Sequence, residues 1–204
     1  MTIGIGTPGE MGQAAVALAD APLIKVKLDD RHVIERMQAV RQGAPDARLI
    51  VDPNEAWDLD FLAAVVPELA AMGVEMIEQP LPADADGGLA GFDSPITLCA
   101  DEACHTSTDL PGLVGKYGMI NIKLDKTGGL TEAIDLARAA QTAGFKIMVG
   151  CMVGTSLAIA PAALLGPFAE FVDLDGPLLL QQDRPEGLHF ENGCVYPPNP
   201  GLWG

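Results

Sequence analysis

"IKVKLDD", residues 24–30, has the alternating pattern of a buried β-strand, and it carries two lysines two positions apart. Side chains alternate between the two faces of a strand, so Lys25 and Lys27 point to one side while the apolar residues around them point to the other. Two ammonium groups in a protein interior are costly unless charged partners or a chemical task explain them. The stretch therefore predicts a fold in which a buried strand ends in a polar site.

Seven further segments resemble this strand, and several of them also end in polar residues. Near-continuous apolar runs are typical of parallel strands that helices cover on the outside. Most of the intervening stretches are rich in Ala and Leu at helical spacing, as in residues 59–73 and 131–144. The predicted strand that carries the two lysines spans residues 23–28. The seven others span residues 2–6, 48–54, 74–80, 96–102, 119–125, 146–151 and 171–176.

Eight alternations of strand and helix predict an α/β fold, a TIM-type (β/α)7β barrel of eight parallel strands over residues 1–182. An open doubly wound sheet is the alternative. It would usually carry a Gly-rich phosphate loop after the first strand, and "GIGTPGEMG" (4–12) matches that motif only loosely. After the last strand we expect no eighth helix but an irregular Pro/Gly-rich tail, residues 183–204, which has few ways to bury itself alone and suggests a partner surface elsewhere.

The composition limits the classes of partner. A formal net charge of −16 argues against nucleic acid or an anionic membrane as the partner. No apolar run reaches the roughly 18 residues that a membrane-spanning helix needs. The N-terminal stretch "MTIGIGTPGEMGQ" lacks the basic start and apolar core of a signal peptide, so the default expectation is a cytoplasmic protein.

Charged side chains recur at the carboxyl ends of the predicted strands, where a (β/α) barrel carries its chemistry. Asp52, Glu78 and Asp101 each follow an apolar run, on three consecutive strands. Neighbouring strands would bring the three carboxylates within reach of one point, where they cannot crowd together without a cation. Oxygen ligands with no His or Cys favour Mg²⁺ or Mn²⁺.

The geometry of a closed barrel extends this prediction. Strands two and six are four apart in a ring of eight, so Lys27 and Lys123 would face each other across the mouth. Asp173 and Asp175 share one face of strand eight, opposite strand four. A substrate held by its carboxylate on the metal would have its next carbon between the lysines and its far end near these two carboxylates. Such a site is suited to moving a proton at a carbon α to a carboxylate, from both faces.

Seven motifs stand in a fixed order along the chain: "KVK" at 25–27, "VDPNEAW" at 51–57, "IEQPL" at 77–81, "ADE" at 100–102, "NIKLDKTGG" at 121–129, "GCMVGTS" at 150–156 and "DLDGP" at 173–177. The set covers nearly the whole chain and resembles the muconate-lactonizing-enzyme subgroup of the enolase superfamily. Within that subgroup, "DLDGP" resembles the motif of the dipeptide epimerases.

The resemblance implies a Mg²⁺ site, with Mn²⁺ as the alternative ion, held by Asp52, Glu78 and Asp101. It also implies that Lys27 and Lys123 are the two acid/base catalysts. Lysine bases beside Mg²⁺ are a known arrangement of enolase-type sites. The expected reaction is epimerisation of a dipeptide at the α-carbon next to its C-terminal carboxylate, by two-base proton transfer through an enediolate.

Five further roles are expected around this centre. The resemblance implies that Asp173 and Asp175 bind the α-ammonium of the dipeptide. Lys25, beside the proposed base, is expected to lower the proton affinity of that base by like-charge repulsion and to contact the substrate carboxylate. Asn54 and Glu102 are expected either to support the metal ligands or to be purely structural.

Two alternatives to a dipeptide epimerase stay open. The first is cycloisomerase, N-acylamino-acid racemase or o-succinylbenzoate synthase chemistry on the same barrel. "DLDGP" (173–177) argues against it, because a substrate without an ammonium gives the paired carboxylates nothing to neutralise. The second is of another class, a barrel that binds a metal or a partner but turns over poorly because no cap closes it.

Related barrels carry an N-terminal capping domain that covers the mouth. We expect residues 183–204 to pack on such a domain, which is either absent here through truncation or supplied as a separate chain. The expected partner is a small-molecule dipeptide, with neither nucleic acid nor membrane, and a homo-oligomer is also open.

Overall fold

The computed structural model describes residues 1–203 and confirms an α/β fold with all eight predicted parallel strands. The strands are β1 (Thr2–Ile3), β2 (Leu23–Lys27), β3 (Arg48–Asp52), β4 (Val74–Glu78), β5 (Thr97–Ala100), β6 (Met119–Ile122), β7 (Lys146–Val149) and β8 (Phe171–Val172). Each observed strand is shorter than predicted, and β2, β3 and β4 end on their polar residues Lys27, Asp52 and Glu78, of which Lys27 and Asp52 pair with each other and Glu78 pairs with Cys99.

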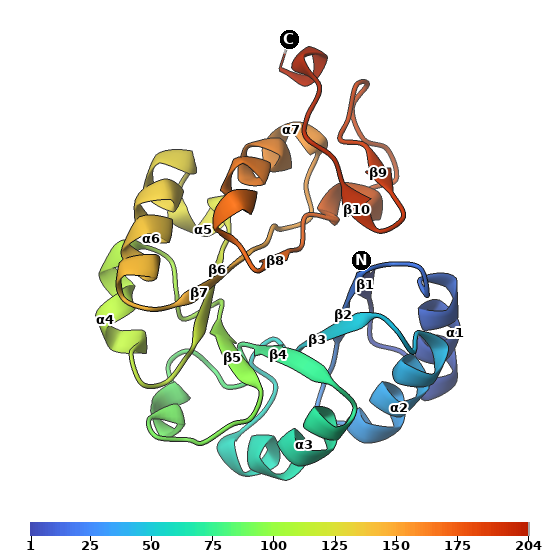
Figure 1. Cartoon of the computed structure of the whole chain (residues 1–204), viewed down its shortest axis with the longest axis vertical. Coiled ribbons are helices and arrows are strands. Elements are labelled where there is room, and N and C mark those ends of the chain that lie inside the picture. The colour runs from blue at the N-terminus through green and yellow to red at the C-terminus, as the bar shows by residue number, and fades with distance from the viewer. Residues whose placement is uncertain (204) are drawn as a thin grey trace. The chain divides into compact units, whose positions relative to one another are not determined.

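The chain forms two compact units. Unit 1 comprises Met1–Ala103 and Gly115–Tyr117, and unit 2 comprises Cys104–Val114 and the residues from Gly118 onward. Unit 1 thus holds strands β1 to β5, and unit 2 holds β6 to β8 (Figure 1).

In unit 1 the five strands pair in chain order, and all pairs are parallel. The register sets Lys27 beside Asp52 and Glu78 beside Cys99, so the polar strand ends lie at one edge of the sheet. Three helices cover one face of this sheet (Figure 1), namely α1 (Pro8–Ala17), α2 (Val33–Gly43) and α3 (Leu59–Ala71). Only a short 3₁₀ turn, η1 (Asp86–Leu89), follows β4.

Local sequence signals explain where these helices start. Thr7 and Glu10 form a reciprocal capping box at the N-terminus of α1, and Pro8 is its first residue. The Asp58 side chain accepts a hydrogen bond from the backbone N–H of Phe61 at the start of α3, at 2.8 Å.

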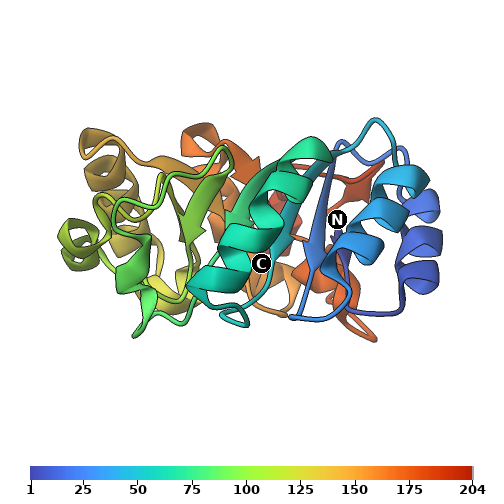
Figure 2. The same ribbon diagram turned by 90° about the horizontal axis from the view of Figure 1, so that it is seen from below.

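Helices α1 and α2 lie side by side in both views (Figures 1 and 2). Small residues permit this close approach. A Cβ added to Gly43, the last residue of α2, would lie 2.6 Å from the Gly12 carbonyl oxygen and 2.9 Å from the Ala15 Cβ. The backbone of one helix therefore occupies the space that any other side chain at position 43 would need.

In unit 2 the three strands are also parallel, with Ile122 paired to Val149 and Val149 paired to Val172. The helical segments of this unit are η2 (Ser107–Asp109), α4 (Leu110–Leu113), α5 (Leu124–Thr127), α6 (Leu130–Thr142), α7 (Ser156–Ile159), η3 (Ala160–Phe168) and η4 (Gly176–Leu179). Helix α7 continues directly into η3, so the helical segment between β7 and β8 is mostly a tighter 3₁₀ helix.

The C-terminal tail is less irregular than predicted. Strands β9 (Phe190–Glu191) and β10 (Cys194–Val195) form an antiparallel pair, and η5 (Pro200–Leu202) follows. Asn192 and Gly193 join the two strands with φ of 50° and 74°. An Asn-Gly pair with both residues at positive φ is the preferred two-residue hairpin turn, a signal that the sequence interpretation overlooked.

A search of residues 1–203 for a helix of sufficient length and apolarity to cross a membrane finds none.

The packing of α1 against α2 predicts opposite effects for two glycine substitutions. We expect Gly43→Ala to lower the free energy of unfolding by about 1–3 kcal/mol, because the added methyl group overpacks the helix contact. Gly9→Ala, in α1 where a Cβ would meet nothing within 4 Å, should raise it by about 0.5–1 kcal/mol through helix propensity. Urea unfolding followed by circular dichroism measures both, and equal effects of the two changes would contradict the packing argument.

Candidate active site

Lys25 lies in the middle of β2 and is almost fully buried, with 4% of its surface exposed. Its Nζ is 2.9 Å from Asp52 Oδ2 and 2.7 Å from Glu78 Oε2, so the ammonium bridges the carboxyl ends of β3 and β4. Both carboxylates are fully buried. The two ion pairs therefore offset the free-energy cost of burying the Lys25 ammonium.

Lys27 has a different environment, although it lies on the same strand face. Its side chain is 30% exposed, and its Nζ contacts Asp52 Oδ2 at 2.6 Å and donates to Asn54 Oδ1 at 2.7 Å. Two ammonium groups thus share one oxygen of Asp52, and only the ammonium of Lys27 reaches solvent to an appreciable degree. The structure brings Lys25, Lys27, Asp52 and Asn54 together as the sequence predicts.

Asp52 is the carboxylate that both lysines contact. Its Oδ1 also accepts the backbone N–H of Asn54 at 3.0 Å. Burial alone would raise the pKa of Asp52, but the charges of Lys25 and Lys27 outweigh burial and hold the pKa below its usual value. Asp52 is therefore an anion at neutral pH.

Asp101 and Glu102 follow β5 at the same edge of the unit. Asp101 is 1% exposed. Glu102 receives a long hydrogen bond from Asn54 Nδ2 at 3.4 Å, while its Oε2 is buried and has no hydrogen-bond partner within residues 1–203. Burial, and then the negative charge of Asp101, raise the pKa of Glu102. An orphaned carboxylate oxygen beside a second carboxylate indicates a local shortage of positive charge.

The donor set at this edge of the unit fits a bound cation. Four carboxylates stand at or directly after the ends of β3, β4 and β5, and their oxygens are hard donors of the kind that Mg²⁺ prefers. The carboxylates are Asp52, Glu78, Asp101 and Glu102. The buried Glu102 Oε2, which has no hydrogen-bond partner among residues 1–203, is an oxygen that such a cation would satisfy.

As the side chains stand, residues 1–203 contain no group of three His, Cys, Asp or Glu residues close enough to hold a metal ion. The Lys25 ammonium lies between Asp52 and Glu78, where it neutralises both. The role of these two residues and Asp101 as metal ligands stays a prediction.

In unit 2, Lys123 directly follows β6 and is 6% exposed, while Asp173 directly follows β8 and is 9% exposed. Register through β7 sets their strands at matching heights, so the two residues lie at the same edge of the unit-2 sheet. Asp175 is half-buried and precedes η4. Lys123 and Asp173 thus stand at the strand ends that the sequence predicts, whereas Asp175 lies beyond β8, which ends at Val172, so the predicted strand face shared by Asp173 and Asp175 is not formed.

The sequence interpretation missed Gln79. This residue follows Glu78 in "IEQPL", is fully buried, and makes four side-chain hydrogen bonds. The available signal was an uncharged polar residue inside a buried stretch, which requires partners.

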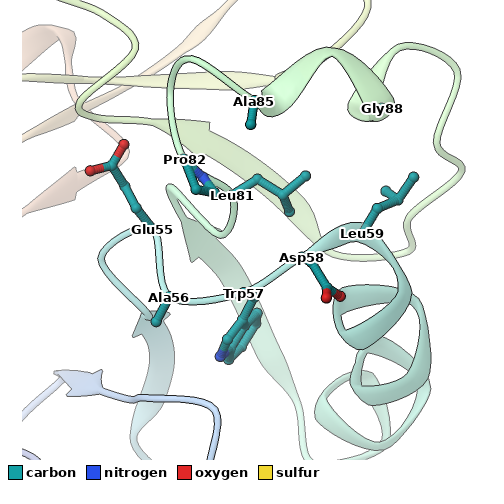
Figure 3. A pocket seen from close by; sticks show the side chains of 9 residues that line it. All are labelled: Glu55, Ala56, Trp57, Asp58, Leu59, Leu81, Pro82, Ala85 and Gly88. Atoms are coloured by element: carbon teal, nitrogen blue, oxygen red, sulfur yellow. The ribbon is translucent and has the colours of Figure 1, made fainter.

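A cavity of about 360 Å³ lies between the loops after β3 and β4 (Figure 3). Its lining is Glu55, Ala56, Trp57, Asp58, Leu59, Leu81, Pro82, Ala85 and Gly88. None of the predicted site residues lines it. Trp57 is only 2% exposed, and its Nε1 donates to the Asp29 carbonyl oxygen at 3.0 Å, so it serves as a packing anchor.

Comparison with known proteins gives one family and several close relatives. Residues 10–202 match the family described as "Enolase C-terminal domain-like". The chain is 53% identical over 203 residues to N-acetyl-D-glutamate racemase of Pseudoalteromonas sp, and 52% identical over 197 residues to L-Ala-D/L-Glu epimerase of Escherichia coli K12. These matches cover 100% and 96% of this chain but only 64% and 61% of the relatives, so the chain spans about three fifths of their length.

A solved structure gives the same picture. An enolase family member from Agrobacterium tumefaciens, described as having homology to dipeptide epimerases and as containing bound sodium and L-Ala-L-Glu, superimposes with a TM-score of 0.94 at 48% identity. The match covers 100% of this chain and 62% of that one.

The buried ion pairs predict a large stability effect at Lys25. We expect Lys25→Met to lower the free energy of unfolding by about 3–5 kcal/mol, because it leaves two buried carboxylates without their shared ammonium. Arg48→Met is the control, since Arg48 pairs with Glu75 at the surface, where such pairs contribute about 0–1 kcal/mol. Denaturant unfolding in the presence of a chelator measures both, and a cost for Lys25→Met no larger than that for Arg48→Met would contradict the pairing argument.

Proposed function

Because the chain belongs to the family of enolase C-terminal domain-like proteins, we propose that the protein inverts the configuration at the α-carbon of a dipeptide, next to its C-terminal carboxylate. The substrate class is that of L-Ala-D/L-Glu dipeptides. The observation that carries the proposal is the cluster in unit 1, where the partly exposed Lys27 lies beside the buried carboxylate of Asp52 and a buried oxygen of Glu102 has no hydrogen-bond partner among the described residues.

In the proposed chemistry, two lysines transfer protons and three carboxylates bind a metal ion. Lys27 and Lys123 act as the two acid/base catalysts, one removing the α-proton and the other returning a proton to the opposite face. Bound by Asp52, Glu78 and Asp101, Mg²⁺ or Mn²⁺ would neutralise the charge that develops on the substrate carboxylate.

Lys25 has a supporting role in this proposal. Its Nζ contacts Asp52 and Glu78 and is nearly inaccessible, which favours orienting these carboxylates over binding substrate. Lys27, by contrast, has the exposure that a residue needs to reach a substrate atom. Asn54 holds the Lys27 ammonium, and it links that ammonium to Glu102.

The wider architecture is also part of the proposal. The eight strands close into a (β/α)7β barrel over residues 1–182, and residues 183–204 pack on a capping domain. Two observations support the packing of the tail on a further domain. The relatives are longer than this chain, and two aromatic residues of the tail, Tyr196 and Trp203, are 44% and 48% exposed. A cytoplasmic location and a homo-oligomer stay predictions.

A second candidate function has specific support. One relative with 53% identity is named N-acetyl-D-glutamate racemase, and its named substrate carries an acylated glutamate just as an alanyl-glutamate dipeptide does. The two substrates differ at the far end, where only the dipeptide has an ammonium group. We favour the dipeptide because two carboxylates, Asp173 and Asp175, stand close together in the chain after β8, and an ammonium group is the substrate feature that such a pair would bind.

The two-base proposal predicts complementary losses in two lysine variants of the full-length protein. In D₂O, Lys27→Ala should lose α-carbon exchange from one epimer of the dipeptide by about 100-fold or more, and Lys123→Ala from the other, because each lysine serves one face. Each variant should keep exchange from the epimer that its remaining lysine serves. Mass spectrometry of recovered substrate gives both rates, and exchange from both epimers at parental rates in either variant would rule out the assignment.

The substrate proposal predicts how Asp175 discriminates. We expect Asp175→Asn to lower kcat/KM for L-Ala-D-Glu by about 10- to 100-fold, the effect of losing a charged hydrogen bond of about 1.5–3 kcal/mol. Turnover of N-acetyl-D-glutamate, which has no ammonium, should change little. Parental turnover that is faster on N-acetyl-D-glutamate than on every dipeptide tested would favour the second candidate instead.

A further inference from the structure

Gln79 uses its whole side-chain amide. Its Nε2 donates to the Leu81 carbonyl oxygen and to Tyr117 Oη, both at 2.9 Å. Its Oε1 accepts the backbone N–H groups of Asp101 at 2.8 Å and Ala103 at 3.1 Å. An amide has two donor hydrogens and two acceptor lone pairs, so this residue is fully satisfied and fully buried.

The backbone of Gln79 joins the same loops. Its N–H donates to the Cys99 carbonyl oxygen at 2.8 Å, and its carbonyl oxygen accepts from the Glu55 N–H at 2.9 Å. Figure 3 shows two of these loops side by side, with Glu55 after β3 and Leu81 after β4. One residue therefore ties together the segments that follow β3, β4 and β5. Two proposed metal ligands, Asp52 and Glu78, end the first two of these strands, and the third, Asp101, directly follows β5.

Gln79 holds an unfavourable backbone conformation to do this. Its φ is 34°, in the left-handed region, which costs of order 1–3 kcal/mol for a residue other than glycine. Such a conformation persists only where the surroundings fix it, and here six hydrogen bonds do so.

A buried polar chain fixes the direction of the amide. Tyr117 Oη accepts from Gln79 and donates to Asp86 Oδ2 at 3.0 Å, while Lys116 Nζ lies 2.6 Å from Asp86 Oδ1. Burial and the charge of Asp86 raise the pKa of Tyr117, so its hydroxyl stays protonated and can donate. The anionic Asp86 thus orients Tyr117, which in turn presents an acceptor to Gln79 Nε2 and leaves Oε1 facing the loop after β5.

We propose that Gln79 is a positioning residue, which, oriented by Tyr117 and Asp86, holds the backbone of Asp101 so that its carboxylate is preorganised for the divalent cation. The inference rests on the proposed function in one respect, that Asp101 is a metal ligand. It goes beyond that function by assigning a task to a polar chain that begins at Lys116 and touches none of the proposed catalysts.

The test compares Mn²⁺ affinity with stability in the full-length protein. Tyr117→Phe removes one hydroxyl and keeps the ring, and Gln79→Met removes the amide at similar volume. Ser94→Ala is the matched control, because Ser94 bonds backbone groups of Ile96 in the turn before β5, away from the carboxyl end of that strand. Electron paramagnetic resonance of free Mn²⁺ gives the dissociation constant, and urea unfolding without metal gives the stability.

We expect both variants to bind Mn²⁺ about 10- to 100-fold more weakly, as is usual when residues that orient metal ligands are removed. Saturating Mn²⁺ should restore α-carbon exchange. Ser94→Ala should lose stability with parental Mn²⁺ affinity. The inference would be overturned if Tyr117→Phe and Gln79→Met both kept the parental affinity for Mn²⁺, or if Ser94→Ala lost as much affinity as they do. It would also be overturned if Tyr117→Phe and Gln79→Met both failed to fold.

Failure of the proposed function is separable from failure of this inference. A parent protein that binds no Mn²⁺ would contradict the metal site itself and the inference with it. A parent that binds Mn²⁺ and exchanges the α-proton, together with variants of unchanged affinity, would overturn the role of Gln79 alone.

Discussion

A buried ammonium between two buried carboxylates organises unit 1. Lys25 Nζ lies within 2.9 Å of Asp52 and 2.7 Å of Glu78, and neither carboxylate is exposed. Uncompensated charges at this depth would cost several kcal/mol each. The middle of β2 and the carboxyl ends of β3 and β4 are therefore joined by charge as well as by backbone hydrogen bonds.

The same cluster suggests how the proposed activity on an anionic substrate is compatible with a strongly acidic chain. Lys25 neutralises part of the charge of Asp52 and Glu78, while Glu102 Oε2 lacks a hydrogen-bond partner among the described residues. A divalent cation bound beside these carboxylates would reverse the local sign of the potential. A substrate carboxylate would then be attracted to a surface that the net charge of −16 would otherwise make repulsive.

Much of the fold follows from the sequence for simple physical reasons. Near-continuous apolar runs such as "LIV" at 49–51 have no solvent-facing side, which indicates parallel strands covered by helices. Alternation fixed the shared face of Lys25 and Lys27, and the position of Asp52 at the end of its strand followed from the polar break. The hairpin turn at Asn192 and Gly193 could also have been predicted from the sequence, because the preference of an Asn-Gly pair for positive φ depends on these two residues alone.

The parts that were not predicted depend on contacts between distant residues. Lys25 is more buried than Lys27, and the residues around it in the sequence do not predict this difference. The burial of Lys25 depends on its contacts with Asp52 and Glu78, which belong to other strands. Gln79 meets Tyr117 across 38 positions, and only the folded chain brings them together. Local patterns therefore predict where a site lies, while the hydrogen bonds that orient it require the tertiary structure.

The central claim is that the carboxylates at the ends of β3, β4 and β5 bind a divalent cation. The most direct measurement is an anomalous difference map from crystals of the full-length protein soaked in Mn²⁺. The account predicts one strong peak per chain, in contact with the carboxylates of Asp52, Glu78 and Asp101. A map with no peak at these residues, or with its strongest peak elsewhere, would contradict it.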